Sequence, residues 1–121
     1  MQRTTKLLAK LSAYGVSGPL HMWIAAFLRD RNQCVRIGNC LSPTVCVRSG
    51  VPQGSVLGPI LFIVYINDVT DILVDDVSCK LYADDLKLYC PIDPTLGFSE
   101  SLQTSLDNLC DWSLKWQLPI N

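Results

Sequence analysis

The 121-residue sequence has little excess charge of either sign. Ten Lys and Arg side chains are balanced by eleven Asp and Glu side chains, for a net charge of −1. This balance argues against a free-standing nucleic-acid clamp, which needs a basic surface. It leaves open a piece of a catalytic core whose basic surfaces lie elsewhere.

The sequence also lacks a long uninterrupted hydrophobic run. The longest uncharged apolar stretch, residues 56–66, is broken by Gly58 and Pro59 and is shorter than the about 20 residues that cross a bilayer. No basic segment followed by an apolar one opens the chain, so we expect no secretory signal and no membrane partner. Internal repeats and low-complexity tracts are absent as well.

Six cysteines are present, but none of them forms a CxxC pair. Their irregular spacing argues against a metal site, and without a secretory signal we expect no disulfide partner for any of them. We therefore expect reduced, mostly buried thiols and an intracellular protein, cytoplasmic or nuclear. The cysteines are Cys34, Cys40, Cys46, Cys79, Cys90 and Cys110.

A length of 121 residues predicts one domain at most, with a single core, and the 49% of hydrophobic residues predict that most of the chain is buried. Apolar side chains recur with helical spacing in four segments. The predicted helices are residues 4–14, a segment that starts at Ser17 and Pro19, residues 56–67 behind the N-cap Ser55, and a segment from the N-cap Ser99 to about 112–116.

Three apolar surfaces on these helices are expected to be buried. The first is the stripe of the second helix, including Leu20 and Trp23, which we interpret as core and not as a binding platform. The helix over 56–67 is apolar nearly all round and should be buried. The last helix should bury the stripe of Leu102, Leu106 and Leu109.

Two strand-like runs, residues 33–37 and 44–48, are joined through Gly38 and Asn39. Arginines gather around this predicted hairpin and either form a solvated face or contact a phosphate backbone. These arginines are Arg29, Arg31, Arg36 and Arg48.

A second predicted hairpin, residues 79–89, carries the acidic pair Asp84 and Asp85 at its tip. Cys79, Leu81, Leu86 and Leu88 would share one face, and Lys80, Tyr82, Lys87 and Tyr89 the other. The sequence leaves the turn centred on either 83–84 or 84–85. The tip is either a polar turn or a rigid support for a cation. A second acidic pair, Asp75 and Asp76, lacks alternating partner strands and should be a solvated loop.

Residues 49–55 form a loop dense in glycine and proline that leads directly into the predicted helix 56–67. Small residues ahead of a helix let a ligand approach backbone amides closely. Such loops are common before helices, so this segment alone indicates little.

Together these segments resemble the reverse transcriptase of non-LTR retrotransposons, jockey-like elements in particular. The resemblance rests on residues 49–62 (SGVPQGSVLGPILF), 65–68 (YIND) and 82–85 (YADD). It extends to 14–19 (YGVSGP) and 111–117 (DWSLKWQ), and so covers essentially the whole chain. It implies an α+β fold, a partial reverse-transcriptase palm with a small antiparallel sheet backed by helices.

The resemblance implies a magnesium-dependent RNA-directed DNA polymerase acting on an RNA template, a DNA primer and deoxynucleoside triphosphates. Asp84 would bind the catalytic Mg²⁺ pair, with Asp85 assisting, since Mg²⁺ prefers oxygen ligands. Other residues would border the incoming nucleotide and the template base, or lie near the primer end. These are Gln53 and Gly54, with Pro52 and Gly50 shaping the loop, and Tyr82 and Ala83 near the primer end.

In this family a further catalytic aspartate precedes the helix that here starts near Thr4, and a thumb follows the last helix. Residues 1–121 would thus be a partial reverse transcriptase domain, a palm without the upstream catalytic strand, the fingers and the thumb. Its two-ion Mg²⁺ site would be incomplete, and we expect little or no activity and a tendency to aggregate. The alternatives are a non-catalytic remnant that binds RNA or a partner, and a translated fragment without function.

Overall fold

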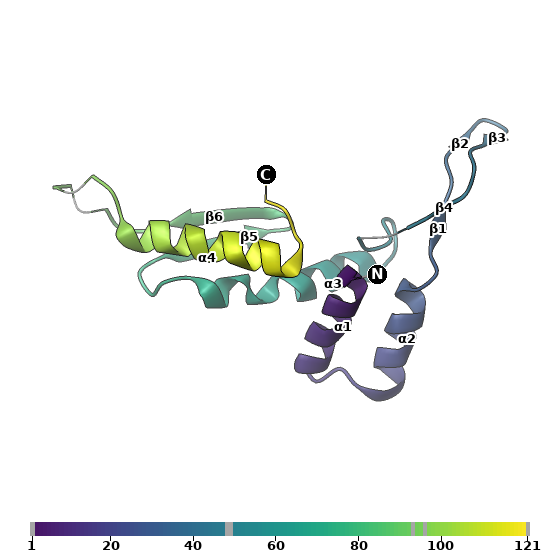
Figure 1. The fold of residues 1–121 in the computed structure, drawn as a ribbon, viewed down its shortest axis with the longest axis horizontal. Helices are drawn as coiled ribbons and strands as arrows, with labels where there is room; N and C mark the ends of the chain where they lie inside the picture. Colours follow the sequence, from purple (N-terminus) through teal and green to yellow (C-terminus); the bar gives the residue numbers. More distant parts are fainter. Residues whose placement is uncertain (1, 48–49, 93, 96, 121) are drawn as a thin grey trace. The chain divides into compact units, whose positions relative to one another are not determined.

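The computed structural model describes residues 2–47, 50–92, 94–95 and 97–120 (Figure 1). In these residues the chain forms four α-helices, one 3₁₀ helix and three two-stranded antiparallel sheets, which is a mixed α+β composition. The chain divides into two compact units, residues 1–64 and residues 65–121. The division falls inside helix α3 (Leu57–Ile66).

The first unit begins with helix α1 (Gln2–Ala13), which ends where the sequence predicts. Gly15 adopts a φ of +85°, a conformation that glycine tolerates without a steric penalty. The Val16 N–H then donates to the Leu11 carbonyl at 2.9 Å, which satisfies one of the last carbonyls of the helix.

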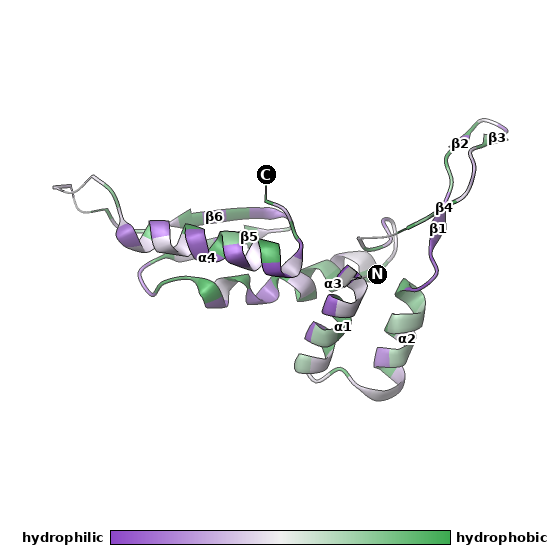
Figure 2. Ribbon diagram, in the orientation of Figure 1, coloured by the Kyte–Doolittle hydropathy of each residue, from purple (hydrophilic) through white to green (hydrophobic). Residues whose placement is uncertain are grey.

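Helix α1 contacts helix α2 (Gly18–Leu28). His21 joins them, because its Nε2 lies 3.1 Å from the Leu8 carbonyl oxygen. The expectation that the apolar stripe of α2 is buried is wrong for Leu20 and Trp23, which are both 55% exposed. The hydropathy colouring shows α2 apolar over much of its length (Figure 2), so periodicity alone does not tell which apolar side finds a partner. The buried apolar residues of the two helices are Leu7, Leu11, Ile24 and Ala25.

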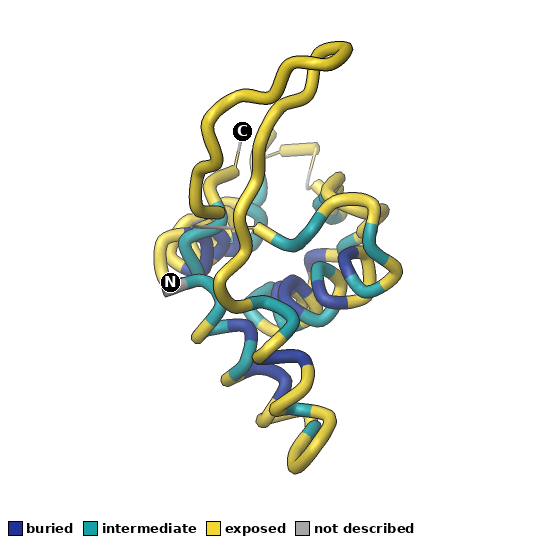
Figure 3. Tube along the Cα trace, turned by 90° about the vertical axis from the view of Figure 1, so that its right-hand side faces the viewer, coloured by how far each residue is buried: buried dark blue, intermediate teal, exposed yellow. Residues whose placement is uncertain are grey.

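A long hairpin arm follows α2. Strand β1 (Asn32–Gln33) pairs with β4 (Val45–Cys46), and β2 (Arg36–Ile37) pairs with β3 (Cys40–Leu41) around a turn at Gly38. The predicted hairpin is thus confirmed, although its return arm already begins at Cys40. Every residue from 29 to 47 is exposed, as the yellow arm in Figure 3 shows. Arg48, the fourth arginine expected around this hairpin, lies outside the described residues.

The second unit contains the end of α3, the 3₁₀ helix η1 (Asn67–Ile72), strands β5 (Ser78–Tyr82) and β6 (Asp85–Tyr89), and helix α4 (Glu100–Trp116). Helix α4 packs against η1. The buried apolar residues described in this unit are Tyr65, Ile66, Val69, Val77, Leu109 and Trp112.

Three polar side chains of α4 attach the segment 68–74 to the helix. The Trp112 Nε1–H donates to Asp68 Oδ1 at 3.1 Å, and Asn108 Nδ2 donates to a backbone carbonyl of η1 at 2.9 Å. The Ser105 hydroxyl oxygen accepts the Val74 N–H at 3.1 Å. These bonds fix the chain just before it enters β5.

Helix α4 begins as predicted, because the Ser99 hydroxyl oxygen accepts the Leu102 N–H at 3.2 Å. Its buried face differs from the expected leucine stripe. Leu106 is 40% exposed, whereas Ser105 is fully buried. The hydrogen bond from Val74 allows a hydroxyl to occupy this position, because a buried polar group needs a partner.

Helix α3 is not buried all round as expected. Leu61 is 2% exposed, but Ile60 and Ile63 are 54% and 56% exposed. An apolar stripe of this helix therefore faces solvent. No helix in the described part of the chain is both long and apolar enough to cross a membrane.

The expectation of mostly buried cysteines is wrong. All six are free thiols; Cys79 and Cys90 are half-buried, and the other four are exposed. Three of these exposed thiols lie on the hairpin arm, which no other layer covers. Burial raises the pKa of the Cys79 thiol, since a low-dielectric environment disfavours the thiolate.

Candidate active site

The acidic hairpin forms with the alternation that its sequence predicts. Residues of β5 and β6 pair in register from Ser78 opposite Tyr89 to Tyr82 opposite Asp85. The turn is therefore centred on 83–84, which resolves the register that the sequence leaves open. Ala83 has a φ of +52°, the left-handed region that tight two-residue hairpin turns require.

The two faces of this hairpin are those expected. Cys79, Leu86 and Leu88 are half-buried, whereas Leu81, nearest the turn, is 39% exposed. The opposite face is exposed throughout and carries Ser78, Lys80, Tyr82, Asp85, Lys87 and Tyr89. One packed face and one solvated face give the acidic tip a fixed support.

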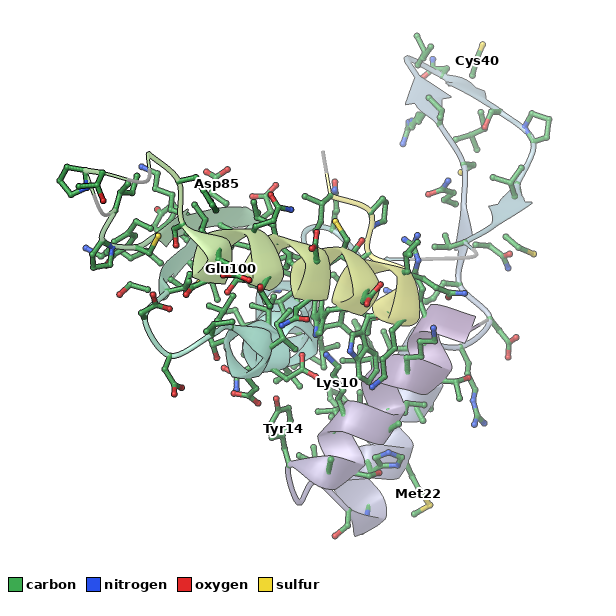
Figure 4. All side chains as sticks on the ribbon, turned by 60° about the vertical axis from the view of Figure 1, so that its left-hand side comes forward. Lys10, Tyr14, Met22, Cys40, Asp85 and Glu100 are labelled. Carbon is green, nitrogen blue, oxygen red and sulfur yellow. The ribbon has the colours of Figure 1, made fainter. Side chains whose placement is uncertain are left out.

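Asp84 lies in the turn and Asp85 opens β6, and both side chains are exposed (Asp85 is labelled in Figure 4). Within the described residues, neither carboxylate has a hydrogen-bond or ion-pair partner. Asp75 and Asp76 are exposed too, but they lie in a turn outside any strand pair, as expected of a solvated loop. Only the first pair is therefore held at the tip of a paired hairpin.

The donor chemistry of this tip suits a hard divalent cation. Two adjacent carboxylates offer oxygen ligands, and Mg²⁺ commonly completes its octahedron with water and substrate phosphates. The described residues contain no group of three or more His, Cys, Asp or Glu side chains that could hold a metal by themselves. Asp84 and Asp85 fit Mg²⁺ as a partial ligand set.

The glycine-rich loop ahead of α3 is the second candidate element. Gly50 and Gly54 have φ values of +86° and +76°, a region that other residues rarely adopt. Gln53 and Gly54 are exposed and Pro52 is half-buried. The loop therefore presents backbone and one amide side chain to solvent.

A short network closes the base of this loop onto α3. The Ser55 hydroxyl donates to the Pro52 carbonyl at 2.7 Å and accepts the Gly58 N–H at 3.0 Å, which supports its prediction as a helix cap. A Cβ on Gly58 would lie 2.9 Å from the Pro52 carbonyl oxygen, closer than real contacts allow. Sequence reasoning missed this role of Gly58. The available signal was a glycine three positions after the cap.

The predicted site residues thus fall into two local clusters. Tyr82, Ala83, Asp84 and Asp85 share the turn of the acidic hairpin in the second unit, whereas Gly50, Pro52, Gln53 and Gly54 share the loop in the first unit. Each cluster has a defined local geometry of its own.

Known proteins supply an independent comparison. A sequence profile of the family described as "Reverse transcriptase (RNA-dependent DNA polymerase)" matches residues 3–121, and this range includes both clusters. The chain is 32% identical over 112 residues to the RNA-directed DNA polymerase from mobile element jockey of Drosophila funebris, covering 88% of this chain and 12% of that protein. No solved structure matches the chain.

Two proteins from Drosophila melanogaster are similar to the chain to about the same degree. Identity is 33% over 108 residues to the RNA-directed DNA polymerase from mobile element jockey, covering 84% of this chain and 12% of that protein. It is 34% over 109 residues to the probable RNA-directed DNA polymerase from transposon BS, covering 85% and 12%. The chain thus spans about an eighth of the length of these relatives. With the acidic turn and the glycine loop inside the matched range, this chain belongs to the reverse transcriptase (RNA-dependent DNA polymerase) family.

Proposed function

We propose that residues 1–121 form the central part of the palm of a mobile-element RNA-directed DNA polymerase, with Asp84 and Asp85 as metal ligands. The observation that carries the proposal is the acidic turn. Two exposed carboxylates, without partners among the described residues, lie at the tip of a hairpin whose strands pair over five residues each. The family profile matches the chain from residue 3 to 121.

In this proposal each residue of the turn has a local task. Asp84 and Asp85 provide oxygen ligands, while the β5–β6 pairing holds the turn in which Asp84 lies and from which Asp85 continues into β6. Bound Mg²⁺ would activate the primer 3′-hydroxyl and stabilise the leaving pyrophosphate. Tyr82, which is 84% exposed, and Ala83 border the position of the primer end.

The glycine loop would receive the incoming deoxynucleoside triphosphate and the template base. Among the described residues of this loop, Gln53 is exposed and carries hydrogen-bonding groups. Gly50 and Gly54 keep side-chain bulk away from the approaching ligand, and Pro52 ties the loop to Ser55. The proposed partners are therefore an RNA template, a DNA primer and nucleotides.

We further propose that these 121 residues alone extend a primer slower than a whole polymerase by orders of magnitude. Two-metal transfer requires carboxylates that face one another across the metals, and the acidic hairpin supplies ligands from one side only. The facing strand, the fingers and the thumb would come from sequence outside residues 1–121, in line with the greater length of the relatives.

The test of the metal site is a titration of the isotopically labelled chain with paramagnetic Mn²⁺, followed by nuclear magnetic resonance. Amide signals of residues 83–86 should broaden first, and Asp84→Asn with Asp85→Asn should abolish this broadening. Excess Mg²⁺ should reverse it, because both ions prefer the same oxygen ligands.

The chain offers a matched control in its second acidic pair. Asp75→Asn with Asp76→Asn removes the same charge from an exposed turn in the same unit, and should leave the broadening at 83–86 unchanged. Equal broadening at both pairs would contradict the metal-site proposal. Efficient Mg²⁺-dependent primer extension by the 121 residues alone would contradict the proposed incompleteness.

A second candidate function is non-catalytic RNA or partner binding through the hairpin arm. The observation in its favour is that residues 29–47 are exposed throughout and include Arg29, Arg31 and Arg36. Filter binding of RNA at several salt concentrations tests it, because phosphate contacts make affinity fall with salt. Arg29→Gln with Arg36→Gln should weaken RNA binding if the arm is responsible. Unchanged binding would remove this candidate.

A further inference from the structure

The solvated face of the acidic hairpin carries an unusual charge arrangement behind its tip. Lys80 of β5 lies directly opposite Lys87 of β6. Side chains of directly opposite residues have Cβ atoms about 5 Å apart, and like charges in this position destabilise the strand pair. Both lysines are exposed, and within the described residues neither ammonium group forms an ion pair with a carboxylate. The two ammonium groups therefore have no ion-pair partner among the described residues, and the nearest carboxylate on this face, that of Asp85, lies one row away.

The neighbours of this lysine pair on the same face are two tyrosines, one serine and the acidic side chain of Asp85. Tyr82 opposite Asp85 forms the next row toward the turn, and Ser78 opposite Tyr89 the next row toward the base. Successive rows on one face are two residues, or about 6.8 Å, apart along a strand. Tyr82 is 84% exposed and Tyr89 is 49% exposed, so an exposed aromatic ring stands on each side of the lysines.

Basic side chains interleaved with exposed aromatic rings are typical of surfaces that follow a nucleic-acid backbone. The chain as a whole has a net charge of −1, so its overall charge gives no electrostatic attraction for polyanions. A polyanion would therefore be attracted by a local cluster and not by the molecule at large. The lysine pair is such a cluster, one row behind the carboxylates of the tip.

We propose that Lys80 and Lys87 bind backbone phosphates of the nucleic-acid strand whose end lies at the Asp84–Asp85 turn. This assignment rests on the proposed function, because it places the strand relative to the metal ligands. The phosphates pair with two ammonium groups that form no ion pair among the described residues, and the strand passes along the solvated face between the two tyrosines.

The test is fluorescence anisotropy with a labelled DNA primer annealed to an RNA template, in EDTA and over a series of KCl concentrations. Removing one phosphate contact makes the slope of log K against log salt shallower by about 0.9. Lys80→Gln and Lys87→Gln should each reduce the slope by about that amount, and the double variant by about twice as much. Lys115→Gln removes one exposed lysine of the same unit and should leave the slope unchanged.

Lys87→Glu separates binding from folding. An opposite-charge pair with Lys80 replaces the like-charge pair, so thermal unfolding should occur at a higher temperature than in the parent chain. Affinity for the duplex should nevertheless fall further than in Lys87→Gln. Reduced binding by a more stable protein cannot result from a damaged fold.

Several results would overturn the assignment: a parent chain that shows no salt-dependent binding, lysine variants that bind like the parent, or a reduction of the salt slope in Lys115→Gln as large as theirs.

Because the experiment contains no divalent metal and no catalysis, it is independent of the Mn²⁺ titration. Metal binding at the turn without duplex binding would overturn the lysine assignment alone. Duplex binding without metal binding would overturn the metal site alone.

Discussion

Ala83 has a backbone conformation that its methyl side chain disfavours. Its φ of +52° lies in the left-handed region, which costs an L-residue roughly 1–2 kcal/mol. The residue directly precedes Asp84, so this strain lies in the turn that holds the proposed metal ligands. The pairing of β5 with β6 on both sides of the turn maintains it.

Replacing Ala83 by glycine should therefore stabilise the chain. Glycine removes the steric cost but loses about 0.4–1 kcal/mol through the greater entropy of the unfolded chain, which leaves a gain of about 0–1.6 kcal/mol. Urea unfolding measures this difference. The matched control is Ala9→Gly, an exposed position inside α1, which should destabilise by about 1 kcal/mol. A decrease in stability of Ala83→Gly would contradict the described turn.

At the scale of elements, helix α4 shows what local sequence determines and what it does not. Its start could be predicted from Ser99, because a cap is a contact between residues three positions apart. The acidic hairpin could be predicted for the same reason, since its alternation and turn lie within twelve residues. The burial of Ser105 could not, because its partner Val74 lies 31 residues earlier in the chain.

Ser105→Ala tests the importance of this distant contact. The substitution leaves the Val74 N–H without its acceptor in a site where residue 105 is fully buried, so the free energy of unfolding should fall by about 1–3 kcal/mol. Thermal or urea unfolding measures the decrease. Thr104→Ala removes a hydroxyl from the neighbouring exposed position and should be neutral or slightly stabilising, because alanine favours helix. Equal destabilisation of both variants would contradict a specific role for Ser105.

In the candidate site, too, the features that depend on neighbouring residues could be predicted, and those that depend on close packing could not. The placement of Asp84, Asp85 and the loop glycines in tight local turns could be predicted from short motifs, because such turns depend on immediate neighbours. The role of Gly58 was missed, because it depends on how closely the Pro52 carbonyl approaches the first turn of α3. The burial of the cysteines was predicted wrongly, because the arm that carries three of them forms strand pairs without a covering layer.

At the scale of the whole molecule, apolar side chains remain exposed well beyond the hairpin arm. Ile60 and Ile63 lie three positions apart on α3 and are both more than half exposed. Neighbouring apolar residues on one helix face form a surface that is favourable to cover. The expected tendency of these 121 residues to aggregate remains a prediction, and this stripe gives it a location.

Ile60→Lys with Ile63→Lys should therefore lower self-association at high protein concentration. Both side chains are exposed, so the fold should persist, and sedimentation velocity over a concentration series should show less of the larger species. Leu61→Lys, between them, places a charge where the native side chain is 2% exposed and should unfold the chain, as circular dichroism would reveal. Unchanged sedimentation of the double variant would show that association uses another surface.

The register of the acidic hairpin has a consequence for the order in which the protein matures. All of its cross-strand pairs lie between Ser78 and Tyr89, so no later residue is needed to align them. Hairpins of this kind close within about 1–10 μs, far faster than a ribosome adds the next amino acid. The cross-strand register of the acidic tip can therefore be set while α4 is still being synthesised, before that helix packs against η1.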